Sequence, residues 1–167
     1  MATVVSNASP LILLAGVGQF DRLRDLFSEI LVSPKVFEEV AIRGKGRPGS
    51  EEVASASFVR QKPVTQGSRV AGLQERAQLA EGEASTIILA DELKADLVLI
   101  DEKAARAAAK SFGLKVAGTM RVLELAYERT LIKDLREAYI RLKAGPAHLA
   151  PGLLDASLAK YKLPPLT

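Results

Sequence analysis

The chain has 167 residues, a length typical of a single domain with a substantial hydrophobic core. It contains no cysteine and one histidine, which excludes disulfide scaffolds, thiolate metal sites and sites built from several histidines. Lys and Arg total 23 against 20 Asp and Glu, so the formal net charge is +3, a balance compatible with contact to a polyanion.

The first twenty residues carry no charged side chain, as in a signal peptide or a membrane span. No basic residues precede the apolar stretch, however, and polar residues and glycines interrupt it. A buried first strand followed by a helix explains the same pattern. We therefore expect a cytoplasmic protein that does not contact a membrane.

In the first half of the chain, short apolar strands alternate with helices. Strands are expected at 2–6, 30–33 and 58–64, and helices at 10–17, at 19–27, from Pro34 onward, and at 70–79. Ser9 is the expected N-cap of the first helix, with Pro10 as its first residue. Pro63 places the strand at 58–64 near a sheet edge. Residues 43–50, RGKGRPGS, predict a mobile basic loop.

The second half continues the alternation more clearly. Helices are expected at 83–93, 104–112, 119–129 and 131–143, and strands at 96–100 and 114–117. Gly113 suits a helix C-terminus and Thr119 suits an N-cap. The pattern predicts an α/β domain with a mainly parallel sheet. We expect this domain to cover 1–145, and the tail at 146–167 to hold a short helix that packs on the domain or on a partner.

Polar residues mark the places where a parallel sheet carries its binding site, the carboxyl ends of its strands. Asn7 follows the first strand, Asp101 ends the strand at 96–100, and Glu83 lies in the first turn of its helix. Glu39 is less constrained, toward the C-terminal half of its helix. Carboxylates without histidine or cysteine suit Mg²⁺ or Mn²⁺, which activate water and stabilise charge on a phosphoryl transition state.

Each of these acids also has a purely structural explanation. Glu83 would favour the positive end of the helix macrodipole, and Glu39 would belong to a solvated helix face. Asp101 would be an ordinary turn or cap residue at a strand end. Their joint placement, more than any single residue, points to a site.

Four stretches taken together resemble the PIN-domain superfamily. They are VVSNASPLILLAGVG, LVSPKVFEEVA, AEGEASTIILADELKADLVLIDEKAARAAAKSFGLKVAGT and RVLELAYERTLI. Within the superfamily, the chain is most similar to PIN-like proteins related to VapC-type toxin ribonucleases. The resemblance implies a three-layer α/β/α domain around a mainly parallel sheet of about five strands. It also implies a Mg²⁺- or Mn²⁺-dependent ribonuclease site, a toxin–antitoxin role with an antitoxin protein as partner, and a homodimer.

Matched by motif, the catalytic and metal-holding positions of the family fall on four residues: Asn7, Glu39, Glu83 and Asp101. Supporting positions fall on Ser9, Glu102 and Thr119. The chain departs from the family at Asn7, where PIN nucleases usually carry aspartate. The amide keeps a carbonyl oxygen but removes one negative charge, which is expected to weaken Mg²⁺ binding.

This departure leaves alternative functions open. The first is a metal-dependent endoribonuclease that hydrolyses RNA phosphodiesters. The second is a catalytically silent PIN-like module that binds RNA or a protein, and the third is a phosphohydrolase of small esters.

Two groups of basic residues are candidates for RNA binding. Arg43, Lys45 and Arg47 lie on the glycine-rich loop, and Lys103 and Arg106 follow Asp101 on a predicted helix. Both groups suit contacts to an RNA backbone, and both also suit an ordinary solvated surface. His148, in a segment rich in Ala and Pro, is expected at the surface and outside the catalytic set.

Overall fold

The protein, described by a computed structural model over residues 2–150 and 152–167, is built on a five-stranded parallel sheet. The strand order is β3-β2-β1-β4-β5, and all neighbouring strands pair in parallel. The strands are β1 (Val4–Ser6), β2 (Ile30–Val32), β3 (Val59–Gln61), β4 (Leu97–Leu99) and β5 (Val116–Ala117). The edge position of β3 confirms the prediction made from Pro63, although this strand ends before the proline.

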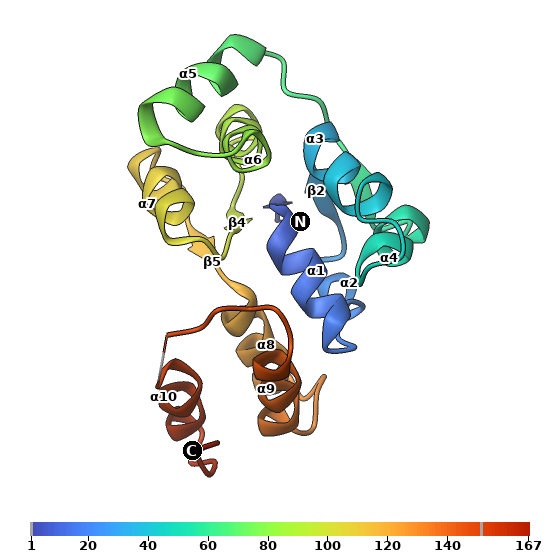
Figure 1. Ribbon diagram of the computed structural model, residues 1–167, viewed down its shortest axis with the longest axis vertical. Helices are drawn as coiled ribbons and strands as arrows, with labels where there is room; N and C mark the ends of the chain where they lie inside the picture. The colour runs from blue at the N-terminus through green and yellow to red at the C-terminus, as the bar shows by residue number, and fades with distance from the viewer. Residues whose placement is uncertain (1, 151) are drawn as a thin grey trace.

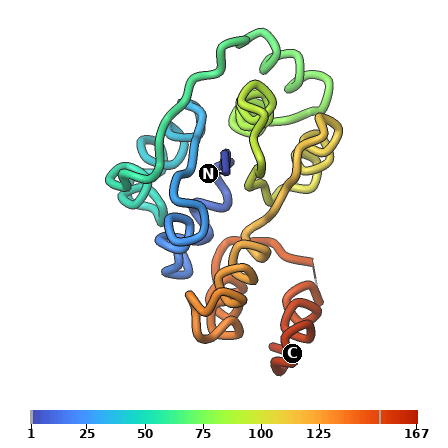
Figure 2. The backbone as a smooth tube through the Cα atoms, turned by 180° about the vertical axis from the view of Figure 1, so that it is seen from behind, coloured from blue at the N-terminus to red at the C-terminus, as the bar shows by residue number. Residues whose placement is uncertain are grey.

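Helices cover the sheet, and some of them extend the molecule beyond one end of it (Figure 1). They are α1 (Ala8–Gly16), α2 (Arg22–Phe27), α3 (Pro34–Phe37), the π-helix η1 (Glu38–Ile42), α4 (Ser50–Ser55), α5 (Gly67–Ala77), α6 (Glu81–Leu93), α7 (Lys103–Ser111), α8 (Thr119–Glu128), α9 (Leu135–Ala144) and α10 (Leu153–Lys160). Helices α8, α9 and α10 gather at the end of the molecule opposite α5, as the reverse view also shows (Figure 2). Over the described residues, no helix has the length and apolar character needed to cross a membrane.

Two hydrophobic clusters form the core, one on each face of the sheet. Successive strand residues point to opposite faces, so Val4 and Val5 of β1 enter different clusters. Val4 and Leu99 pack with residues of α1, α8 and α9, whereas Val5 and Val98 pack with residues of α5, α6 and α7. This arrangement confirms the expected three-layer α/β/α architecture.

The N-terminal ends of α1, α8 and α9 differ from the sequence predictions in ways that bear on the site and the tail. Asn7, with φ −79° and ψ 175°, is the N-cap of α1, so Ser9 already lies inside the helix. Gly118 is the N-cap of α8, so Thr119 is its first helical residue. Helix α9 begins after Asp134, whose side chain accepts a hydrogen bond from the Glu137 N–H at 2.9 Å. The hydroxyls of Ser9 and Thr119 bind carboxylates of the site instead.

The segment after Pro34 differs most from expectation. Helix α3 begins at this proline as predicted, but it continues into η1, where the Arg43 N–H donates to the Glu38 carbonyl five residues earlier at 2.8 Å. The expected loop at 43–50 is a series of turns that ends at Ser50. There α4 begins, a helix that the sequence analysis missed, and its Val53 is buried in the core.

The C-terminal tail is joined to the rest of the fold by a buried polar network. Glu124 of α8 is 5% exposed and accepts hydrogen bonds from Ser157 at 2.6 Å, Lys160 at 2.9 Å and Arg121 at 3.1 Å. The Tyr139 hydroxyl lies 2.6 Å from the Ser157 hydroxyl, and burial raises the pKa of this tyrosine to about 12. Charge and hydrogen bonds therefore fix α10 against α8 and α9.

Glu124→Gln is expected to lower the free energy of unfolding at pH 7 by about 1–3 kcal/mol, because a neutral amide would face two cations in a buried site. Burial raises the pKa of Glu124, but hydrogen bonds from Ser157, Lys160 and Arg121 outweigh it and lower the pKa below 4.5. The stabilisation is therefore complete above pH 4.5 and is lost as the pH falls through the lowered pKa.

Urea unfolding of the wild type and the variant between pH 7 and pH 4 measures this difference. Glu137→Gln is the matched control, because its ion pair with Arg141 is exposed and is expected to contribute less than about 0.5 kcal/mol. An unfolding free energy for Glu124→Gln equal to that of the control would contradict the role of the network.

Candidate active site

Three neighbouring strands bring polar residues to one edge of the sheet. Ser6 of β1 pairs with Leu99 of β4, and the Asn7 N–H continues this ladder by donating to the Leu99 carbonyl at 2.9 Å. On the other side of β4, the Ile100 N–H donates to the Ala117 carbonyl at 2.9 Å. The residues that follow these strands therefore meet at their carboxyl ends, as the parallel topology requires.

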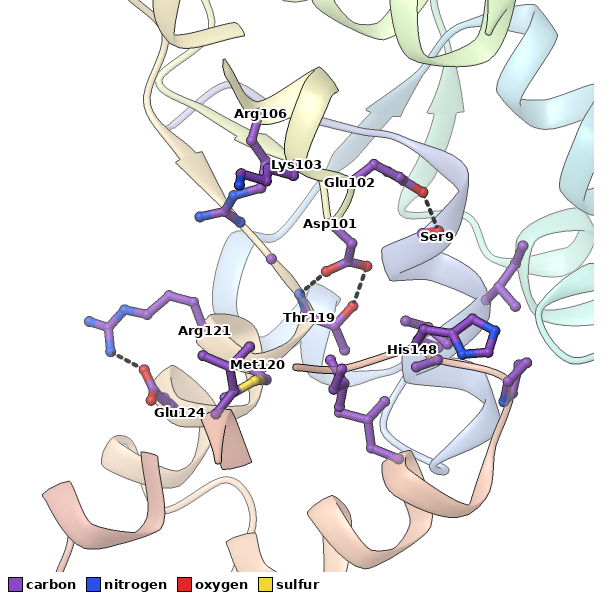
Figure 3. Close-up of a pocket in the computed structure, with 18 of the residues that line it drawn as sticks. Ser9, Asp101, Glu102, Lys103, Arg106, Thr119, Met120, Arg121, Glu124 and His148 are labelled. Carbon is purple, nitrogen blue, oxygen red and sulfur yellow. Dashed lines mark hydrogen bonds and ion pairs between the residues drawn. The ribbon is translucent and has the colours of Figure 1, made fainter. Parts of the chain in front are cut away.

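Asp101 is held at this edge by the first residue of α8. The Thr119 N–H donates to Asp101 Oδ1 at 2.7 Å, and the Thr119 hydroxyl donates to Oδ2 at 2.8 Å (Figure 3). A Cβ atom on Gly118 would lie only 2.8 Å from Oδ1, so glycine permits this close approach. Burial raises the pKa of Asp101, and the hydrogen bonds from Thr119 and the charge of Arg106 oppose that effect.

Glu102, the next residue, is held by the start of α1. The Ser9 hydroxyl donates to Glu102 Oε1 at 2.7 Å, and the Asn7 side-chain amide donates to Oε2 at 3.3 Å (Figure 3 shows the serine contact). Asn7 is 3% exposed, and its side chain forms no cap hydrogen bond with α1. The structure thus brings together Asn7, Ser9, Asp101, Glu102 and Thr119.

The other two predicted acids, Glu83 and Glu39, contact backbone groups near the start of α6. Glu83 Oε1 accepts a hydrogen bond from the Ala80 N–H at 2.9 Å, so this carboxylate closes the first turn of its own helix. Glu39, on η1, packs against Gly82, where a Cβ atom would lie 2.7 Å from Oε1. Burial raises the pKa of Glu39, whereas the charges of Lys35 and Arg43 lower it. Among residues 2–150 and 152–167, no three acidic or histidine side chains converge as a metal-binding group.

A pocket of about 860 Å³ opens beside Asp101 and Glu102. Its basic lining residues come from α7 and α8: Lys103, Arg106, Lys110 and Arg121. The predicted RNA contacts Lys103 and Arg106 thus share a pocket with the two carboxylates, although the Arg106 guanidinium also donates to the Ile100 carbonyl at 3.1 Å. The combination of carboxylates and cations in one pocket suits a phosphate-containing ligand.

The remaining predicted cations lie elsewhere. Arg43 and Lys45 are exposed on the turns after η1, and Arg47 lines a second pocket of about 470 Å³ together with Glu39. Arg121 of α8 and His148 of the tail also line the first pocket, although the sequence analysis placed neither in the site (Figure 3). His148 is exposed, as the sequence predicted. The position of Arg121, two residues after Thr119, was the only signal for it. No local pattern marks His148, because the tertiary packing of the tail places it there.

A family model described as a PIN domain matches residues 3–162. The chain belongs to the PIN-domain family. The parallel sheet between two helical layers agrees with this assignment. PIN domains have a nuclease-type fold and generally use divalent metal ions. No curated protein matches the chain.

The donors at the sheet edge of this PIN domain suit a hard cation. Mg²⁺ is usually held by one or two carboxylates and keeps several waters, so it does not require four converging acids. Asp101 supplies a carboxylate in the pocket, and Asn7 retains its side-chain oxygen because only its amide nitrogen is bound to Glu102. The oxygen donors of this PIN domain therefore fit Mg²⁺ or Mn²⁺.

Asp101→Asn is expected to raise the melting temperature of the metal-free protein at pH 7 by roughly 2–4 °C, the shift that about 1 kcal/mol produces in a chain of this size. The new side chain can accept from the Thr119 N–H and donate to its hydroxyl, so both contacts survive without a buried charge. Because the pKa of Asp101 is raised in the folded state, its ionisation reduces stability as the pH rises from 3.8 through that raised pKa.

Thermal denaturation of both proteins without divalent ions, between pH 7 and pH 4, checks this expectation. The difference in melting temperature should narrow as the pH falls through the raised pKa of Asp101, because protonation removes the buried charge of the wild type. A lower melting temperature for Asp101→Asn at pH 7 would show instead that the negative charge stabilises the fold.

Proposed function

We propose that this PIN domain is a metal-dependent ribonuclease that hydrolyses RNA phosphodiesters. The observation that supports it is the position of Asp101, which is fixed by two hydrogen bonds and lines a pocket that also contains four basic side chains. Hydrolysis of an RNA phosphodiester needs both features. Basic side chains bind the RNA backbone, and a carboxylate holds the metal ion that promotes hydrolysis.

Asp101 would hold the ion, with Asn7 as a weaker oxygen ligand. When bound, such an ion lowers the pKa of a coordinated water and stabilises charge on the phosphoryl group. The chain itself provides positioning: Thr119 fixes the Asp101 carboxylate, while Lys103 and Arg106 line the same pocket and would contact a phosphate bound there. Glu39 and Glu83 contact the start of α6 and do not line this pocket, so the proposal rests on Asp101.

A toxin role, an antitoxin partner and a homodimer belong to the same proposal. They rest on the resemblance to VapC-type proteins. The candidate RNA contacts at Arg43, Lys45 and Arg47 rest instead on their position in the basic, glycine-rich segment. The exposure of these three side chains leaves them accessible to RNA.

A second candidate function is a catalytically silent PIN-like module that binds RNA or a protein. Two observations favour it: position 7 is a neutral amide, and both Glu39 and Glu83 contact the N-terminal region of α6. Under this alternative the basic pocket would still bind RNA, but no phosphodiester would be cleaved.

Incubation of single-stranded RNA with the protein and Mn²⁺ or Mg²⁺ separates the two functions. The ribonuclease proposal predicts cleavage that requires the ion and falls at least about hundredfold in Asp101→Asn, since this change removes the principal ion-holding carboxylate. Glu75→Gln, the same type of change on an exposed face of α5, is the control and should cleave like the wild type.

RNA binding by the wild type and by Asp101→Asn with equal affinity, and without cleavage by either, would contradict the ribonuclease proposal and support the binding module. Gel shift with the same RNA measures the affinity in parallel with cleavage.

A further inference from the structure

Position 7 contacts an acid that lies almost a hundred residues later in the chain. The Asn7 side-chain nitrogen donates to Glu102 Oε2 at 3.3 Å, and the Ser9 hydroxyl donates to the other oxygen at 2.7 Å. Both donors come from the start of α1, where the helix macrodipole also favours a negative charge. One carboxylate thus receives one donor on each oxygen, an arrangement that fixes its orientation.

Glu102 stands beside Asp101 in the same pocket, but a different element holds each carboxylate. Asp101 is bound to Thr119 at the start of α8, and Glu102 is bound to the start of α1. Both carboxylates line the 860 Å³ pocket, together with Ser9 and Thr119 (Figure 3). Each carboxylate oxygen has a second lone pair, so these contacts leave both acids able to bind a cation.

The neutral side chain of Asn7 avoids a charge repulsion with Glu102. A carboxylate introduced there would place an oxygen about 3.3 Å from Glu102 Oε2, and two negative charges at that separation repel each other. The amide nitrogen of Asn7 replaces this repulsion with a hydrogen bond. The site then keeps two negative charges, on Asp101 and Glu102, which is a number of carboxylates that Mg²⁺ commonly uses.

From these contacts we infer that Glu102 is the second ion-holding carboxylate of the site, in place of an acid at position 7, and that Asn7 and Ser9 are its positioning residues. This inference rests on the proposed function, because it assumes that the pocket binds a divalent ion. It changes the role of Glu102 from a supporting residue to a ligand, and it makes the amide at position 7 a component of the site.

Calorimetric titration of Mn²⁺ into the purified protein tests the inference without relying on catalysis. Glu102→Gln and Asp101→Asn should each weaken Mn²⁺ binding at least about tenfold, whereas Glu75→Gln should leave it unchanged. Ser9→Ala should weaken binding about tenfold through loss of orientation, and Ser9→Thr, which keeps the hydroxyl, should restore it. A cooperative thermal transition in each variant shows that the fold is intact.

A double-variant comparison isolates the pairing of the two side chains. Asn7→Asp should lower the metal-free melting temperature through carboxylate repulsion, and adding Glu102→Gln should restore it, because the new amide can donate to the new carboxylate. Additive effects of the two changes would overturn the pairing.

The outcomes separate this inference from the proposed function. Mn²⁺ binding that is lost in Asp101→Asn but unchanged in Glu102→Gln would overturn the role of Glu102 and leave the ribonuclease proposal standing. An absence of Mn²⁺ binding by the wild type would overturn both. Loss of binding in both single variants supports both.

Discussion

The pairing of β4 with both β1 and β5 is the constraint on which the candidate site depends. Hydrogen bonds from the Asn7 N–H to β4, and from the Ile100 N–H to β5, continue the sheet ladder into the site itself. The backbone on either side of Asp101 is therefore set by the most buried part of the fold, where Val98, Leu99 and Ile100 have no measurable exposure. Because the backbone of the site continues the sheet, it is already ordered before a ligand binds.

Helix starts then determine what each carboxylate does. The first residues of α1 bind Glu102, the first residue of α8 binds Asp101, and α6 binds its own Glu83. Each contact places a negative charge near the positive end of a helix dipole, which offsets part of the cost of burying that charge. The first two carboxylates line the pocket with the basic side chains, whereas the third completes a helix cap. Similar local electrostatics thus give the acids of one PIN domain different roles.

The sequence predicted the part of this arrangement that follows from strand order. Short apolar strands placed Asn7 and Asp101 at strand ends, and parallel pairing makes such ends neighbours. The hydrogen bond between the Glu83 side chain and the Ala80 N–H was harder to predict, because Ala80 at the N-cap lacks the hydroxyl of the usual capping-box pattern. The contact between Ser9 and Glu102 joins residues 93 positions apart, so no local pattern marks it. Helix α4 was missed because tertiary packing, through burial of Val53 in the core, stabilises it. The glycines that precede it also conceal its start in the sequence.

Anomalous X-ray diffraction from crystals soaked in Mn²⁺ tests the central claim most directly, because it locates the ion independently of affinity and activity. The account predicts a Mn²⁺ peak in the pocket at the carboxyl ends of β1 and β4, in direct contact with the Asp101 and Glu102 carboxylates. A peak bound instead by Glu39 and Glu83 at the start of α6, or no peak in a crystal whose pocket is open to solvent, would contradict it.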